Sequence, residues 1–105
     1  MLEKHVVACI VKALKQRAGV VVRKRHGTAM GVAGDPDLYG SINGRHFEIE
    51  VKRPDDSGSN PTELQAYRMQ EWRASGALVG IARSVEEALA ILGVALQDFG
   101  REARS

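Results

Sequence analysis

The sequence predicts a single mixed α/β domain, a sheet flanked by helices, and three observations support this. Apolar residues recur at helical spacing over residues 3–17. Two segments of alternating polar and apolar residues flank Asn43-Gly44, which is the strongest short-range hairpin signal. A second helix then leads into the apolar segment 77–83, and this order calls for a right-handed crossover and a parallel strand pair.

The first predicted element is an amphipathic helix over residues 3–17, whose lysines lie opposite its apolar stripe. Gly19 ends this helix. The β-branched residues 20–22 continue into the basic sequence 23–26, which predicts a strand with a basic end. Residues 27–36 are rich in glycine and predict a loop where the backbone closely approaches another group.

The next two elements are the strands of a hairpin, over roughly residues 37–42 and 45–52. Asn60 is then the predicted N-cap of a helix, with Pro61 at its first position, and this helix ends at Gly76. Segment 77–83 predicts a buried strand. The element order up to this point is one helix, three strands, one helix and one strand.

The last predicted helix begins at a capping box formed by Ser84 and Glu87 and continues to about residue 92. Residues 100–105 look frayed, as chain ends often are. We therefore predict one domain over residues 1–105 with a core at about 2–92, which suits the length of the chain.

Composition and charge narrow the class of protein. The net charge of +2 permits a nucleic-acid partner without requiring one. Cys9 is the only cysteine, which excludes an internal disulfide and a multi-cysteine zinc site, and fits a reducing compartment. Charged residues interrupt the apolar N-terminal segment, which argues against a signal peptide or a membrane span. We expect a soluble, intracellular protein.

The hairpin register brings two acids together. A two-residue turn at Asn43-Gly44 sets Asp37 opposite Glu50, and Lys52 projects to the same face. Opposed carboxylates are destabilising unless they are neutralised, and such a pair is a geometry for Mg²⁺ or Mn²⁺, which prefer oxygen ligands. The alternative is an exposed hairpin face on which Lys52 or Arg45 balances the acids.

Two polar residues also interrupt the apolar stripes of the helices. Glu3 shares a face with Val7 and Ile10, so an unpaired carboxylate there would be costly if the face were buried. Its position in the first turn offers another explanation, since acids favour the helix dipole. Gln65 shares a face with Trp72, where an amide often bonds only to nearby backbone.

Together these residues resemble the virus-type replication-repair nuclease (VRR-NUC) domain of the PD-(D/E)xK nuclease superfamily. The matching residues, in chain order, are Glu3, Gly34-Asp35-Pro36-Asp37, Glu50-Val51-Lys52 and Gln65. The resemblance covers roughly residues 2–92 and implies a restriction-endonuclease-like mixed sheet flanked by helices, in the order αβββαβα. It leaves Asp35 and Glu48 without a role.

The resemblance also implies site residues. Asp37, Glu50 and the backbone carbonyl of Val51 would bind the divalent metal, which Glu3 would bind or orient through water. Lys52 would orient the attacking water or stabilise the charge that develops on the phosphate, and Gln65 would support the site. The implied activity is a Mg²⁺- or Mn²⁺-dependent DNA endonuclease acting on branched or structured DNA in replication, recombination or repair.

Substrate contacts and partners are further expectations. The best candidates to contact nucleic acid are basic residues and one tyrosine: Arg23, Lys24, Arg25, Arg53 and Tyr39. A solubilising strand end explains the basic segment equally well, and a core or edge position is the favoured explanation of Tyr39. By analogy with relatives in the superfamily we expect a homodimer, and a phage or prophage origin. The alternatives are a nuclease acting on RNA and a nucleic-acid-binding module that does not cleave.

Overall fold

The computed structural model describes residues 2–25, 31–55 and 60–93. These residues form three helices and four strands in the predicted order. The elements are α1 (Glu3–Lys15), β1 (Val20–Lys24), β2 (Leu38–Ile42), β3 (Arg45–Val51), α2 (Glu63–Ala74), β4 (Leu78–Ala82) and α3 (Val85–Ile91). The predicted α/β class and element order are therefore confirmed, while the predicted fraying of residues 100–105 lies outside the described residues.

The four strands form one mixed sheet in the order β1-β2-β3-β4. The first three strands are antiparallel, and β3 and β4 are parallel, as the crossover through α2 requires. Asn43 and Gly44 have φ values of 49° and 87°, so the hairpin turn has positive φ at both central residues, as a type I′ turn requires. The predicted register is confirmed from Ile42 opposite Arg45 to Tyr39 opposite Glu48.

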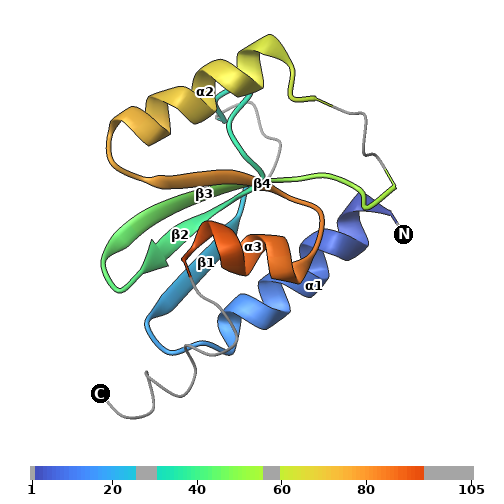
Figure 1. Cartoon of the computed structure of the whole chain (residues 1–105), viewed down its shortest axis with the longest axis vertical. Helices are drawn as coiled ribbons and strands as arrows, with labels where there is room; N and C mark the ends of the chain where they lie inside the picture. Colours follow the sequence, from blue (N-terminus) through green and yellow to red (C-terminus); the bar gives the residue numbers. More distant parts are fainter. Residues whose placement is uncertain (1, 26–30, 56–59, 94–105) are drawn as a thin grey trace.

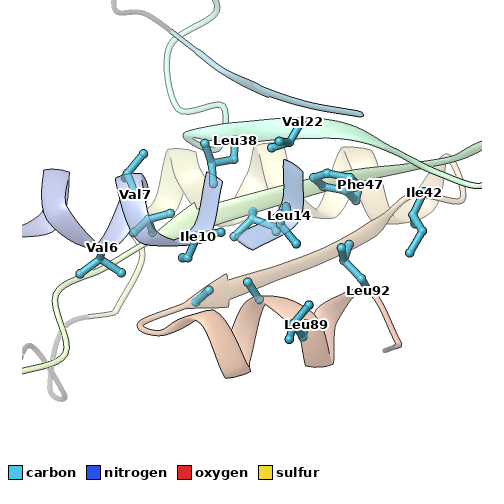
Figure 2. Close-up of a cluster of buried hydrophobic side chains, with 14 residues drawn as sticks. Val6, Val7, Ile10, Leu14, Val22, Leu38, Ile42, Phe47, Leu89 and Leu92 are labelled. Carbon is cyan, nitrogen blue, oxygen red and sulfur yellow. The ribbon is translucent and has the colours of Figure 1, made fainter. Parts of the chain in front are cut away.

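Helices cover both faces of the sheet, with α2 on one face and α1 and α3 on the other (Figure 1). The core lies between the sheet and the α1–α3 layer, where Ile10 and Leu14 of α1 are fully buried (Figure 2). Phe47 and Ile49 of β3 point into this core. The residues that alternate with them on β3 therefore point towards the α2 layer.

The start of α2 differs from the prediction. The N-cap is Thr62 rather than Asn60, and its hydroxyl accepts a hydrogen bond from the backbone N–H of Gln65 (3.1 Å). The side chain of Gln65 in turn accepts from the Thr62 N–H (3.0 Å), which completes a reciprocal capping box. The N-cap predicted at Ser84 is confirmed, although the Glu87 side chain accepts from Arg83 N–H.

No helix in the described ranges combines the length and the hydropathy that a membrane crossing requires.

Candidate active site

The predicted site residues converge at one end of the sheet from four elements. Asp37 directly precedes β2, and Glu50 and Lys52 lie at the end of β3. Glu3 is the first residue of α1, and Gln65 lies in the first turn of α2. We call this group the acidic centre: Glu3, Asp37, Glu50, Lys52 and Gln65.

Asp37 is held by the neighbouring strand. Its Oδ2 accepts a hydrogen bond from the backbone N–H of Val51 at 2.9 Å. The strand pairs end at Leu38 opposite Ile49, and one further step of the same register sets Asp37 beside Glu50. The bond to Val51 fixes one carboxylate oxygen of Asp37 and leaves the other for a further ligand.

Glu50 is buried and lies among like charges. Burial, together with the charges of Asp37 and Glu3, raises the pKa of the Glu50 carboxyl from 4.5 to about 7, while the charge of Lys52 opposes this shift. With only 5% of the residue exposed, water does little to relieve this repulsion. The single positive charge of Lys52 therefore does not balance the three carboxylates of the acidic centre.

Two side chains contact the same oxygen of Glu50. The Nζ of Lys52 lies 3.6 Å from Glu50 Oε2, and the Nε2 of Gln65 donates to that oxygen at 3.2 Å. Because Gln65 Oε1 accepts from Thr62 N–H, the capping box turns the NH₂ group of the amide towards Glu50. The amide predicted on an apolar stripe thus joins the helix cap to the site.

Glu3 contributes to the site by charge. It is exposed at the start of α1, which agrees with the second of the two explanations, a place in the first turn, and the buried stripe begins only at Val6. The first turn of a helix at a domain edge is solvated, and its N-terminal dipole favours an acid. Glu3 still lies close enough to Glu50 to raise the pKa of that carboxyl.

A second ionic group surrounds Glu48, which lies on the same face of β3 as Glu50. The Glu48 side chain is fully buried, and Arg25 donates to both of its oxygens, at 2.5 and 3.0 Å. His46 Nε2 lies 2.5 Å from Glu48 Oε2. Glu48 therefore has the bidentate partner that a buried carboxylate needs.

Arg25 also braces the segment that carries Asp37. Its guanidinium donates to the carbonyl of Pro36 at 2.8 Å, and its backbone N–H donates to the carbonyl of Asp37 at 2.8 Å. Its Nε lies 3.9 Å from Asp35 Oδ2, and Asp35 Oδ1 accepts from the indole of Trp72 at 3.0 Å. The Glu48–Arg25 pair thus connects β3 to the chain immediately before β2.

Gly34 permits α2 to approach this segment closely. It has a φ of +86°, and a Cβ atom there would lie 2.6 Å from Leu64 Cγ. The sequence predicted such a close backbone approach for the glycine-rich loop at residues 27–36. The structure describes residues 31–36 of this loop.

The residues predicted to contact nucleic acid fall into two groups. Arg23, Lys24 and Arg53 are exposed, although Arg53 lies 3.7 Å from Asp55. Arg25 is committed to Glu48, and its guanidinium also lies 4.6 Å from the centre of the Tyr39 ring. Contact with a substrate stays a prediction for all five, but Arg25 and Tyr39 already have partners within the protein.

The donor set of the acidic centre suits a hard divalent cation. In the described part of the chain, no three His, Cys, Asp or Glu side chains converge closely enough to form a metal-binding group by themselves. Mg²⁺ typically binds one or two carboxylates and retains several waters, so Asp37 and Glu50 with a backbone carbonyl are sufficient. The raised pKa of Glu50 also shows that added positive charge would stabilise this group of acids.

Comparisons with known proteins identify structural neighbours. No protein-family model matches the sequence, and no curated protein matches it. A solved structure described as a VRR-NUC domain protein superposes with a TM-score of 0.70 at 21% identity, covering 89% of this chain and 86% of its own. Another, described as a VRR-NUC domain, has a TM-score of 0.68 at 25% identity, covering 87% of this chain and 94% of its own.

Proposed function

We propose that this chain, which has the fold of a VRR-NUC nuclease domain, is a Mg²⁺- or Mn²⁺-dependent endonuclease that hydrolyses phosphodiester bonds in DNA. The observation that carries the proposal is the shortage of positive charge around Glu50. A buried carboxyl whose pKa rises to about 7 beside Asp37 and Glu3 calls for a cation.

The proposed ligands are Asp37, Glu50 and the carbonyl of Val51, with Glu3 acting through water. Asp37 suits this role because the Val51 N–H fixes one of its oxygens at 2.9 Å and thereby sets the direction of the other. When bound, a divalent cation lowers the pKa of a coordinated water and polarises the phosphate. The buried position of Glu50 limits the water that competes for the site.

Lys52 and Gln65 complete the proposed mechanism. Lys52 Nζ lies 3.6 Å from Glu50 and is largely buried, so its charge acts in a medium that screens it weakly. In this proposal Lys52 orients the attacking water or stabilises negative charge on the phosphate oxygens. Gln65 touches Glu50 rather than the substrate in this scheme, and it acts as a positioning residue.

A cleavage assay tests the proposal. The purified chain is incubated with supercoiled plasmid, linear duplex, a four-way junction and single-stranded RNA, in Mg²⁺, Mn²⁺ or EDTA. We expect cleavage of DNA with either metal, none in EDTA, and faster cleavage of the junction if branched DNA is the substrate. Asp37→Asn is expected to abolish cleavage, and Glu86→Gln, on an exposed residue of α3, to preserve it.

Several outcomes would reject the proposal. Cleavage that persists in Asp37→Asn, or the absence of cleavage on every substrate, would reject the proposal. Cleavage of RNA alone would show that the substrate is RNA and not DNA. Titration of Mn²⁺ by calorimetry separates a binding module from an enzyme, because only the enzyme needs cation binding that disappears in Glu50→Gln.

We also propose that the chain acts as a homodimer, because a two-fold pair of small domains suits a symmetric branched substrate. Light scattering at micromolar concentration tests this. A monomeric mass in a preparation that cleaves junctions would reject it.

A further inference from the structure

A groove with a basic rim lies between α1 and the edge strand β1. It has a volume of about 790 Å³, and its floor contains Val7, Val11 and Val22. Its rim carries five exposed basic residues: Lys4, Lys12, Lys15, Arg23 and Lys24. We call it the α1–β1 groove.

Among the residues that the structure describes, no acid balances the charges of this groove. None of the described residues that line it is acidic. Within residues 2–25, 31–55 and 60–93, no carboxylate forms an ion pair with any of its four lysines. The whole chain carries a net charge of only +2, so five basic residues in one groove represent a strong local excess. Such an excess attracts a polyanion.

One end of the groove lies beside the acidic centre. Lys4 follows Glu3 in α1, and Lys24 pairs with Leu38, the residue after Asp37. In Figure 1 the chain that leaves β3 runs towards the N-terminus of α1. Lys4 and Lys24 therefore place one end of the groove at the same end of the sheet as the acidic centre.

The spacing of the lysines suits a phosphate chain. Lys4, Lys12 and Lys15 are separated by eight and three residues, so they form one stripe along α1. At 1.5 Å per residue the stripe is roughly 16 Å long, which corresponds to roughly five nucleotides of one B-form strand.

We propose that the α1–β1 groove binds the phosphodiester backbone of the substrate strand where it leaves the acidic centre. This inference rests on the proposed function and names a substrate-binding surface for it. It adds three lysines of α1 to the basic residues predicted from the sequence. An apolar floor with basic rims suits this ligand, because sugars can cover the valines while phosphates meet the lysines.

The test is the salt dependence of DNA binding. Binding of a fluorescein-labelled 20-base-pair duplex in EDTA is measured by anisotropy between about 50 and 200 mM salt. Lys12→Gln/Lys15→Gln removes two contacts more than two helical turns from Glu3, so the acidic centre stays intact. We expect the slope of log K against log salt to become shallower by about two.

A matched control has the same loss of charge elsewhere. Arg45→Gln/Arg73→Gln removes two exposed charges, one from the opposite end of β3 and one from the last turn of α2. The control should keep the slope of the parent protein. An unchanged slope in the lysine variant, or an equal change in both variants, would overturn the inference.

The outcomes also separate this inference from the proposed function. If the parent binds DNA through the lysines but never cleaves it, the inference about the groove is supported and the nuclease proposal is rejected. If the parent cleaves and the lysine variant binds and cleaves equally well, the nuclease proposal is supported and the inference about the groove is rejected. Loss of binding to a poly-glutamate peptide, with duplex binding unchanged, would indicate an acidic protein segment instead and reject the inference.

Discussion

Glu48 and Glu50 lie two residues apart on the same face of β3, and both are buried, but their surroundings differ. Glu48 has a bidentate partner in Arg25 and a second partner in His46. Glu50 has a hydrogen bond from Gln65 and a lysine at 3.6 Å, and its burial and two other carboxylates raise its pKa. The same strand thus carries one acid with a bidentate cationic partner and one acid whose charge is only partly balanced by a lysine.

This difference between Glu48 and Glu50 indicates that the two acids have different roles. A buried ion pair with full hydrogen bonding fixes a conformation, and here it joins β3 to the segment before Asp37. A buried carboxyl with a perturbed pKa is instead typical of functional sites. We therefore expect Glu48 to control folding stability and Glu50 to control chemistry.

The largest expected effect is on catalysis. Glu50→Gln keeps the shape of the side chain but removes a proposed metal ligand, which contributes several kcal/mol to transition-state stabilisation. The cleavage rate with Mg²⁺ should fall by about 1000-fold or more. A single-turnover plasmid assay measures this, with Glu86→Gln as the control. A fall of less than tenfold would contradict the assignment of Glu50.

The pH dependence of stability should also depend on Glu50. In the folded protein this carboxyl retains its proton up to a pKa of about 7, whereas its ordinary pKa is 4.5. Protonated Glu50 therefore contributes its full share to folding stability below pH 4.5, and this contribution is lost as the pH rises towards 7. In EDTA, the free energy of unfolding of the parent should fall relative to that of Glu50→Gln by on the order of 3 kcal/mol across this window. Urea unfolding at several pH values measures this difference in the free energy of unfolding between the two proteins. A difference that does not change with pH would contradict the raised pKa of Glu50.

The next effect concerns the ion pair of Glu48. Breaking a buried pair costs about 3–5 kcal/mol, but Arg25 is partly exposed and glutamine retains one acceptor, so Glu48→Gln should cost about 2 kcal/mol. Urea unfolding at neutral pH measures this cost. Glu71→Gln breaks the exposed pair with Arg68 and should cost less than about 1 kcal/mol. If both variants lose the same stability, the distinction between buried and exposed pairs fails here.

The smallest effect concerns Gln65. Gln65→Glu keeps an acceptor for the Thr62 N–H but loses the donor to Glu50 and adds another carboxylate. Cleavage should slow by about tenfold, as for other supports of metal ligands, and its pH profile should move to higher pH. Gln70→Glu makes the same charge change at an exposed position of α2 and should leave both unchanged. An unshifted profile in Gln65→Glu would limit this residue to its capping role.

Local signals in the sequence predicted much of the fold. Asn43-Gly44 requires positive φ at two successive residues, so it fixed the hairpin register and with it the proximity of Asp37 and Glu50. The N-cap of α2 was misplaced because Asn60 and Thr62 are both good caps. Only Thr62 exchanges hydrogen bonds with Gln65 in the folded chain.

The sequence did not predict that Arg25 is the partner of Glu48. The hairpin register set Glu48 opposite Tyr39, and this is confirmed. No short turn connects Arg25 to β2, so nothing local determines how β1 pairs with it. The need for a cationic partner becomes evident only from the burial of Glu48, which the folded structure shows.

By itself, the sequence determined the order of the elements, the hairpin register and the residue types of the acidic centre. These depend on side-chain periodicity and on turn and cap chemistry, which act within a few residues. Only the tertiary structure decided which acid is neutralised, how strongly the pKa of Glu50 rises, and that lysines of α1 line a groove with β1. Burial and long-range charge depend on segments far apart in the chain, and these meet only when helices pack on the sheet.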